Sequence, residues 1–150
     1  MPLPRWPLSR DVNELIFRLL FSSIFLGLGG EHLVSDELIQ NLMPSWAPYP
    51  RVISVLCGIL LLTGGTMVLV GWRLHLAAYL LGAFLIVVTA VVHLPALFGM
   101  PPHLPAESQW MWDILQRSNL VKNLCLLGVC FELGYHRLGR YSLEALLAEG

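Results

Sequence analysis

Charged residues are scarce in this sequence, and their scarcity excludes most soluble folds. Only 13% of the 150 residues are charged, whereas a soluble domain usually carries about 25%. No Asp, Glu, Lys or Arg occurs between residues 52 and 72 or between residues 74 and 106. A helix needs about 20 apolar residues to cross a bilayer, and both stretches are long enough. We therefore expect membrane-spanning helices, because an open sheet would leave unpaired backbone groups in lipid.

Two further absences narrow the range of functions. The chain has no basic run and a formal net charge of −1, so we expect no nucleic-acid partner. Its three cysteines, Cys57, Cys125 and Cys130, show neither CxxC nor zinc-type spacing. The last two lie five residues apart on one helix, which holds their side chains too far apart for a disulfide. We predict buried, inert thiols and no metal site.

The hydropathy pattern predicts four membrane-spanning helices in a single domain of residues 1–150. We place the helices at about residues 12–33, 52–71, 74–93 and 119–138. A segment at residues 107–116 carries two tryptophans and predicts a short interfacial helix between the third and fourth spans. The fold class is therefore an all-α, antiparallel, transmembrane four-helix bundle. No small-x-small cleavage site follows the first apolar stretch, so we expect it to be retained as an anchor.

Basic residues predict the orientation of these spans. Cytoplasmic loops of membrane proteins carry an excess of Lys and Arg. An N-terminus inside the cell would put five arginines on the inner side and two on the outer side. The inner set is Arg5, Arg10, Arg73, Arg137 and Arg140, and the outer set is Arg51 and Arg117. We therefore expect both termini in the cytoplasm.

Small residues at helical spacing predict where the helices approach one another. Lipid provides no hydrophobic drive between helices, so close contact depends on small side chains. The candidate pairs are Ser23 with Gly27, Gly58 with Gly65, Gly64 with Gly71, and Ala78 with Gly82.

Several ionisable and polar residues fall within or beside the predicted spans. Such residues need a partner or a function, because burying them in lipid is costly. The predicted topology brings Glu31, His32 and His93 to the outer ends of two helices. Lys122 and Asn123 begin the fourth helix on the same side. We interpret these five residues, the outer cluster, as a candidate ligand-binding site.

Three interpretations of the outer cluster stay open. His32 or His93 could exchange protons with a bound quinone or another small ligand near neutral pH. The same two imidazoles could ligate a haem, which is the least favoured of the three interpretations. Alternatively, the cluster is a hydrogen-bonded polar plug in which Glu31 pairs with Lys122.

A second polar level is expected nearer the cytoplasm. Arg18 and Glu132 fall at similar depth in the first and fourth helices, so we predict a structural ion pair between them. Glu14 lies four residues before Arg18, on the same helical face. His75 and His103 fall in loops and are assigned no role.

Short motifs recur in a recognisable order along the chain. They are Gly30-Glu31-His32-Leu33, Gly64-Gly65, Val92-His93-Leu94-Pro95, Lys122-Asn123-Leu124 and Gly139-Arg140-Tyr141-Ser142-Leu143-Glu144. With these motifs the chain resembles the DoxX-like family of small bacterial four-helix membrane proteins, from about Leu15 to Glu144. The final hexapeptide resembles the family's C-terminal signature and is the most specific match. One departure is Leu61, which stands where many relatives have a glutamate.

The resemblance implies a bacterial inner membrane and a redox setting. Relatives are linked to quinone-dependent sulfur oxidation, oxidative-stress complexes and quinone detoxification. We therefore expect an accessory or ligand-binding subunit of membrane redox metabolism that uses the outer cluster. The alternatives are a quinone-linked oxidoreductase, which would use the cluster for proton-coupled electron transfer, and a purely structural subunit. No catalytic residue is assigned; the expected partners are membrane lipids, other membrane or redox proteins, and a second copy of the chain.

Overall fold

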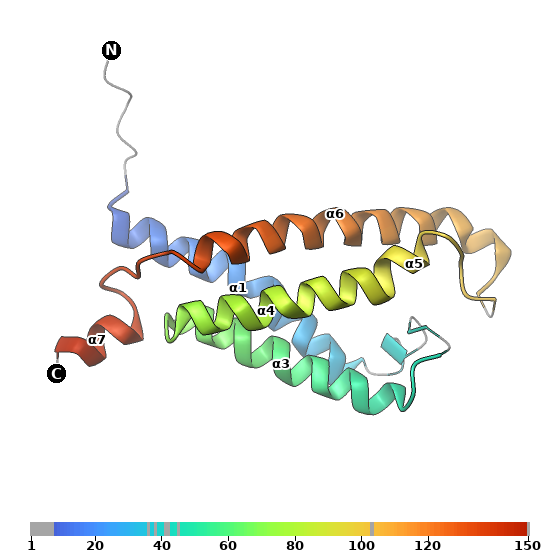
Figure 1. Ribbon diagram of the computed structural model, residues 1–150, viewed down its shortest axis with the longest axis horizontal. Helices are drawn as coiled ribbons and strands as arrows, with labels where there is room; N and C mark the ends of the chain where they lie inside the picture. The colour runs from blue at the N-terminus through green and yellow to red at the C-terminus, as the bar shows by residue number, and fades with distance from the viewer. Residues whose placement is uncertain are drawn as a thin grey trace, which may run out of the picture.

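The computed structural model describes residues 8–35, 37, 39–40, 43–44, 46–102 and 104–149. Within these residues the chain is helical and contains no strand, which confirms the predicted all-α class (Figure 1). The long helices are α1 (Arg10–Val34), α3 (Pro50–Val70), α4 (Leu74–Val88) and α6 (Gln109–Leu133). The short elements are a π-helical turn η1 (Thr89–His93), α5 (Leu94–Ala96), a 3₁₀ turn η2 (Ala106–Ser108) and α7 (Leu143–Glu149). The predictions for Arg5 and His103 lie outside the described residues.

The long helices contact one another in sequence order. α1 packs on α3, α3 on α4, and α4 on α6, so that α4 lies between α3 and α6 (Figure 1). Three described helices are long and apolar enough to cross a membrane: α1, α3 and the continuous helix Leu74–Ala96 formed by α4, η1 and α5. These match the first three predicted spans. α6 has 25 residues but is not among these three helices, and it carries four charged side chains: Asp113, Arg117, Lys122 and Glu132.

The predicted break before the fourth helix is wrong. Instead of an interfacial helix at 107–116 and a span at 119–138, α6 runs without interruption from Gln109 to Leu133. No proline or glycine lies between residues 109 and 127, so nothing removes a backbone donor or weakens the helix there. α6 ends at Leu133, five residues before the predicted limit, and the N–H of the following Gly134 donates to the Cys130 and Phe131 carbonyls.

The third span also differs from the prediction, because it passes through a proline. We expected the span to end at His93, two residues before Pro95. A proline inside an α-helix has no N–H to donate, and its ring collides with the carbonyl four residues earlier. The chain widens into η1 at this point, and the Leu94 N–H reaches back five residues to the Thr89 carbonyl. The wider turn accommodates the proline ring and lets the helix continue through α5.

Glycines allow α1 and α3 to approach backbone to backbone. A Cβ atom added to Gly29 would lie 3.1 Å from the Gly58 carbonyl oxygen and 3.0 Å from the Leu62 nitrogen. One added to Gly65 would lie 3.1 Å from Cβ of Phe25. The predicted contact face with Gly58 and Gly65 is therefore confirmed, and its partner surface on α1 is centred on Gly29.

The predicted contact face of Ser23 and Gly27 is wrong. Both residues are exposed, and a Cβ atom on Gly27 would meet nothing within 4 Å. The buried face of α1 instead carries Ser22, Phe25 and Gly29 at spacings of three and four residues. Small residues recur on two faces of this helix, and spacing alone does not say which face meets a neighbour.

The other predicted pairs and the cysteines can be placed as follows. A Cβ atom on Gly64 would lie 2.7 Å from a Leu81 methyl group, and one on Gly82 would lie 3.4 Å from Cβ of Cys130. Ala78 is buried. The cysteines are all free, and only Cys130 is fully buried as predicted; Cys57 is half-buried and Cys125 is exposed on α6.

Replacing Gly29 with alanine tests the close approach of α1 and α3. We expect Gly29→Ala to lower the free energy of unfolding by about 1–3 kcal/mol, because the added methyl group collides with backbone atoms of α3. A Cβ atom added to the neighbouring Gly30 would have nothing within 4 Å. Gly30→Ala should therefore leave stability unchanged or raise it by up to about 1 kcal/mol through helix propensity. Thermal melting in detergent measures both, and equal melting temperatures for the two variants would contradict the packing.

Candidate functional site

Three polar contacts join the third span to α6. They are Asn123 Nδ2 to Thr89 Oγ1 at 3.1 Å, His93 Nδ1 to Gln116 Oε1 at 3.0 Å, and Trp112 Nε1 to the Ala96 carbonyl at 2.9 Å. We call this series the polar ladder. Its three α6 side chains are each at most 5% exposed. Buried amides and indoles without partners are costly in an apolar setting, so the ladder satisfies groups that would otherwise destabilise this helix pair.

The ladder also sets the chemistry of His93. An amide oxygen only accepts hydrogen bonds, so its contact with Gln116 Oε1 assigns the proton of the neutral ring to Nδ1. The Nε2 atom, on the other side of the ring, is then an acceptor in neutral His93 and a donor after protonation. This is the arrangement by which a histidine exchanges protons with a bound molecule.

Lys122 lies beside the ladder. Its Nζ atom donates to Asn119 Oδ1 at 3.0 Å, within α6. It is also close enough to His93 for an electrostatic interaction. The structure thus gathers three members of the predicted outer cluster, His93, Lys122 and Asn123, at one helix pair.

The remaining two members of the outer cluster lie on α1. The Nδ1 atom of His32 is 3.1 Å from Ser54 Oγ on α3, and Ser54 donates to the His32 carbonyl at 3.2 Å. Glu31 is exposed, and the contact of Lys122 is with Asn119 rather than with this carboxylate. His32 and His93 therefore make their contacts on different helix pairs. Within the described residues, no group of three His, Cys, Asp or Glu side chains could hold a metal ion.

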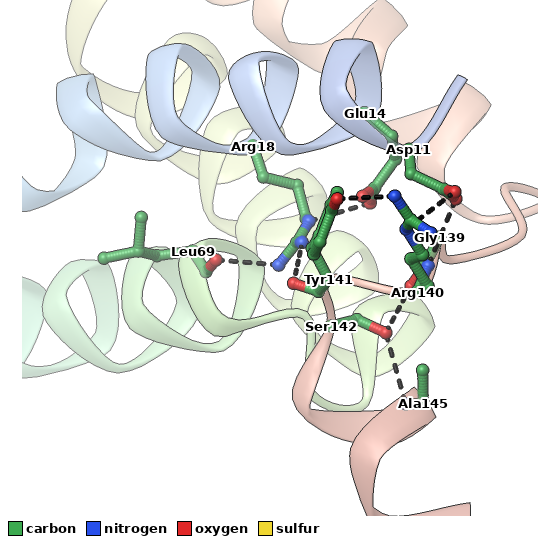
Figure 2. A network of polar contacts seen from close by, with 9 residues as sticks. All are labelled: Asp11, Glu14, Arg18, Leu69, Gly139, Arg140, Tyr141, Ser142 and Ala145. Atoms are coloured by element: carbon green, nitrogen blue, oxygen red, sulfur yellow. Dashed lines mark hydrogen bonds and ion pairs between the residues drawn. The ribbon is translucent and has the colours of Figure 1, made fainter. Parts of the chain in front are cut away.

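A buried ionic contact surrounds Arg18, and Figure 2 shows its partners. The Arg18 residue is 1% exposed. Its Nε atom lies 2.7 Å from Glu14 Oε1, and its Nη1 and Nη2 atoms donate to the Leu69 and Tyr141 carbonyls at 2.8 and 2.6 Å. The guanidinium thus links α1, the end of α3 and the C-terminal tail. We call these four residues the Arg18 node.

The predicted partner of Arg18 is wrong. Glu132 is exposed, whereas Glu14, one turn earlier on the same helix, supplies the carboxylate. The remaining donors find backbone carbonyls. Leu69 belongs to the last turn of α3, where carbonyls have no partner within the helix and the helix dipole attracts a positive charge. Arg18 satisfies this orphan carbonyl and so fixes α1 against the end of α3.

Two glycines leave room for the Arg18 node. Gly71 ends α3 with φ 66°, and a Cβ atom there would lie 2.6 Å from both Arg18 Nη1 and Ser142 Cβ. The following turn through Trp72 is tight, with the Trp72 N–H donating to the Met67 carbonyl. Gly139 fits against α1 in the same way, since its Cβ atom would lie 2.8 Å from Asp11 Oδ1.

The tail, residues 139–149, is held by contacts to both α1 and α3. The Arg140 N–H donates to Asp11 Oδ1 at 3.2 Å, and its Nε atom lies 3.3 Å from Asp11 Oδ2. The Glu144 N–H donates to the Gly71 carbonyl at 3.2 Å. Sequence reasoning used the hexapeptide 139–144 only as a family signature and missed Tyr141 as a partner of Arg18. A backbone carbonyl carries no side-chain signal by which it could have been found.

Double substitution at the Arg18 node tests how its charges depend on each other. We expect Arg18→Met to cost about 3–5 kcal/mol of stability, because it leaves the buried Glu14 carboxylate uncompensated. Arg18→Met combined with Glu14→Leu should be the more stable variant, since no buried charge then remains. The control is the pair of Asp11 and Arg140, in which Arg140 is exposed and Asp11 only partly buried. Asp11→Ala should cost no more than about 1 kcal/mol. Denaturant or thermal unfolding in detergent measures all three, and a double variant no more stable than Arg18→Met would refute the dependence.

Comparison with known proteins gives one match. The model of the DoxX family matches residues 14–94, more than half of the chain. No curated protein and no solved structure matches. The matched region includes Arg18, Gly71 and His93, whereas α6 and the tail lie beyond it. This chain belongs to the DoxX family.

Proposed function

We propose that this DoxX protein is an accessory, ligand-binding subunit of membrane redox metabolism, and that it binds a quinone at the polar ladder. The observation that carries the proposal is the position of His93. His93 lies in the π-helical turn η1, and its ring is anchored by Gln116 of α6. Lys122 directly precedes the ladder residue Asn123 on α6. π-Helical turns inside α-helices are frequent at functional sites.

The chemistry of a quinone fits these groups. A quinone carries two carbonyl acceptors on a flat apolar ring, and its reduced form carries hydroxyl donors instead. The Lys122 ammonium and a protonated His93 donate to a carbonyl, and neutral His93 accepts from a hydroxyl through Nε2. Both side chains are only partly buried, so a ligand can approach them. The adjoining surface is apolar, with Val91 and Leu94 exposed, which suits a lipid-soluble molecule.

In the proposed topology the chain crosses a bacterial inner membrane four times, with adjacent helices antiparallel and both termini in the cytoplasm. Support for the fourth crossing comes from the polar ladder, because α6 turns its amides toward the third span rather than toward lipid. Support for the orientation comes from the contacts of Asp11 with Arg140 and of Gly71 with Glu144. They keep the start of α1, the α3–α4 turn and the tail at one end, together with Arg10, Arg73 and Arg137.

Quinone binding is testable with the full-length protein in detergent micelles. Trp112 belongs to the ladder, so we expect saturable quenching of tryptophan fluorescence by decylubiquinone. His93→Ala and Gln116→Leu should weaken the apparent affinity about tenfold, the equivalent of one good hydrogen bond. The matched control is His75→Ala, a histidine at the opposite end of the same span, which should bind as the wild type does.

Other outcomes would redirect the proposal. Equal quinone affinities for the wild type and His93→Ala would show that the ladder is not the binding site. A Soret absorption band lost in His93→Ala would establish haem instead. Quinone reduction by the purified chain with an added electron donor would establish the oxidoreductase alternative. Normal activity of the host redox system with both His32→Ala and His93→Ala would favour a purely structural subunit.

The orientation is tested separately by fusing reporters to the chain. A green fluorescent protein fused after residue 150 should fluoresce, because it folds in the cytoplasm. Alkaline phosphatase inserted in the loop between Met100 and Leu104 should be active, because that loop is predicted to lie outside. The reverse pattern of the two reporters would invert the topology.

A further inference from the structure

A cavity lies at the end of the molecule opposite the polar ladder. Its volume is about 550 Å³. Its polar lining comes from three places: His75 in the first turn of α4, residues 135–137 after α6, and Ser142 and Glu144 of the tail. From the sequence, no role was expected for His75, and none of the other lining residues was expected to bind a ligand. We propose that this cavity binds the headgroup of an aminophospholipid, phosphatidylethanolamine, from the membrane surface.

The charges of the lining favour a headgroup that carries both signs. Arg137 contributes a basic side chain and Glu144 an acidic one, and the lining also contains His75 and His136. Neither the Arg137 nor the Glu144 side chain is engaged in an ion pair within the described part of the chain. Phosphatidylethanolamine matches this pattern, because its phosphate suits a guanidinium and its ammonium suits a carboxylate. A purely anionic headgroup would meet Glu144 unfavourably.

The position of the cavity agrees with a lipid ligand. It lies where α6 ends and α4 begins, which in the proposed topology is the level of the cytoplasmic headgroups. Basic side chains at this level bind the phosphates of lipid headgroups, and here Arg137 supplies the basic group while Glu144 supplies a site for an ammonium. Two strongly exposed tyrosines lie at this end: Tyr79 on α4, 64% exposed, and Tyr135 just after α6, 88% exposed. Phe131, 65% exposed, lies one turn before Tyr135, on α6. Aromatic side chains favour the interface, and they offer an apolar surface to the lipid chains.

The inference uses the proposed membrane setting but not the quinone site. Its test is native mass spectrometry of the full-length protein in detergent with added phosphatidylethanolamine, phosphatidylcholine or phosphatidylglycerol. We expect the wild type to bind phosphatidylethanolamine about tenfold more tightly than either of the others, since only it donates hydrogen bonds from an ammonium to Glu144. This assay does not depend on orientation or on quinone binding, so the two proposals fail independently.

Variants identify the groups responsible. Glu144→Gln should lower phosphatidylethanolamine binding to the level of phosphatidylcholine, and Glu144→Asp should keep most of the preference. Arg137→Gln should weaken the binding of all three lipids. The matched control is Arg73→Gln, which removes the same charge at the same end but outside the cavity lining, and it should leave the pattern unchanged. The substituted side chains are exposed, and unchanged melting temperatures will confirm that the variants fold.

Soluble competitors separate the headgroup from a simple anion. Phosphoethanolamine should compete with the lipid, whereas inorganic phosphate should compete much more weakly. Equal competition by the two would overturn the proposal in favour of a plain anion site. A preference for phosphatidylglycerol, or a phosphatidylethanolamine preference that survives Glu144→Gln, would also overturn it.

Discussion

The buried guanidinium of Arg18 governs how the ends of these helices meet. A charge removed from water is tolerated only when a counter-charge and hydrogen-bond acceptors surround it. Glu14 supplies the counter-charge, and the Leu69 and Tyr141 carbonyls supply the hydrogen-bond acceptors. Because these partners belong to α1, α3 and the tail, satisfying one side chain fixes three segments at once. Gly71 contributes by having no side chain, since a Cβ atom there would occupy the space of the guanidinium.

The polar ladder solves the same physical problem at the other end by different means. There the polar groups are amides, a hydroxyl, an indole and an imidazole, and they pair across two helices without a full charge at the contact. The π-helical turn that accommodates Pro95 also carries Thr89 and His93, two of the three ladder residues on this span. A backbone irregularity demanded by one proline therefore coincides with the positions that face α6.

The sequence predicted the apolar spans and the Gly58–Gly65 contact face, because these depend on composition and spacing. It also indicated that His93, Lys122 and Asn123 share a level. The predictions from the sequence failed where backbone geometry, or the choice of partner for a side chain, determines the contact. The acceptors of Arg18 are mostly carbonyls, which leave no trace in the sequence. His32 falls at a similar predicted depth to His93, but depth does not specify the neighbouring helix, and its contact runs to Ser54.

The separation of Arg18 from Tyr141 has a consequence for biosynthesis. The donor and acceptor of this hydrogen bond lie 123 positions apart, so the ribosome makes the donor long before the acceptor. While the nascent chain is being inserted, the first helix carries a cation, and one of its final hydrogen-bond acceptors has not yet been made. Water, lipid phosphate or the insertion machinery must solvate that cation until the tail emerges. Arg18 therefore has its full set of partners only after the segment that contains Tyr141 has been made.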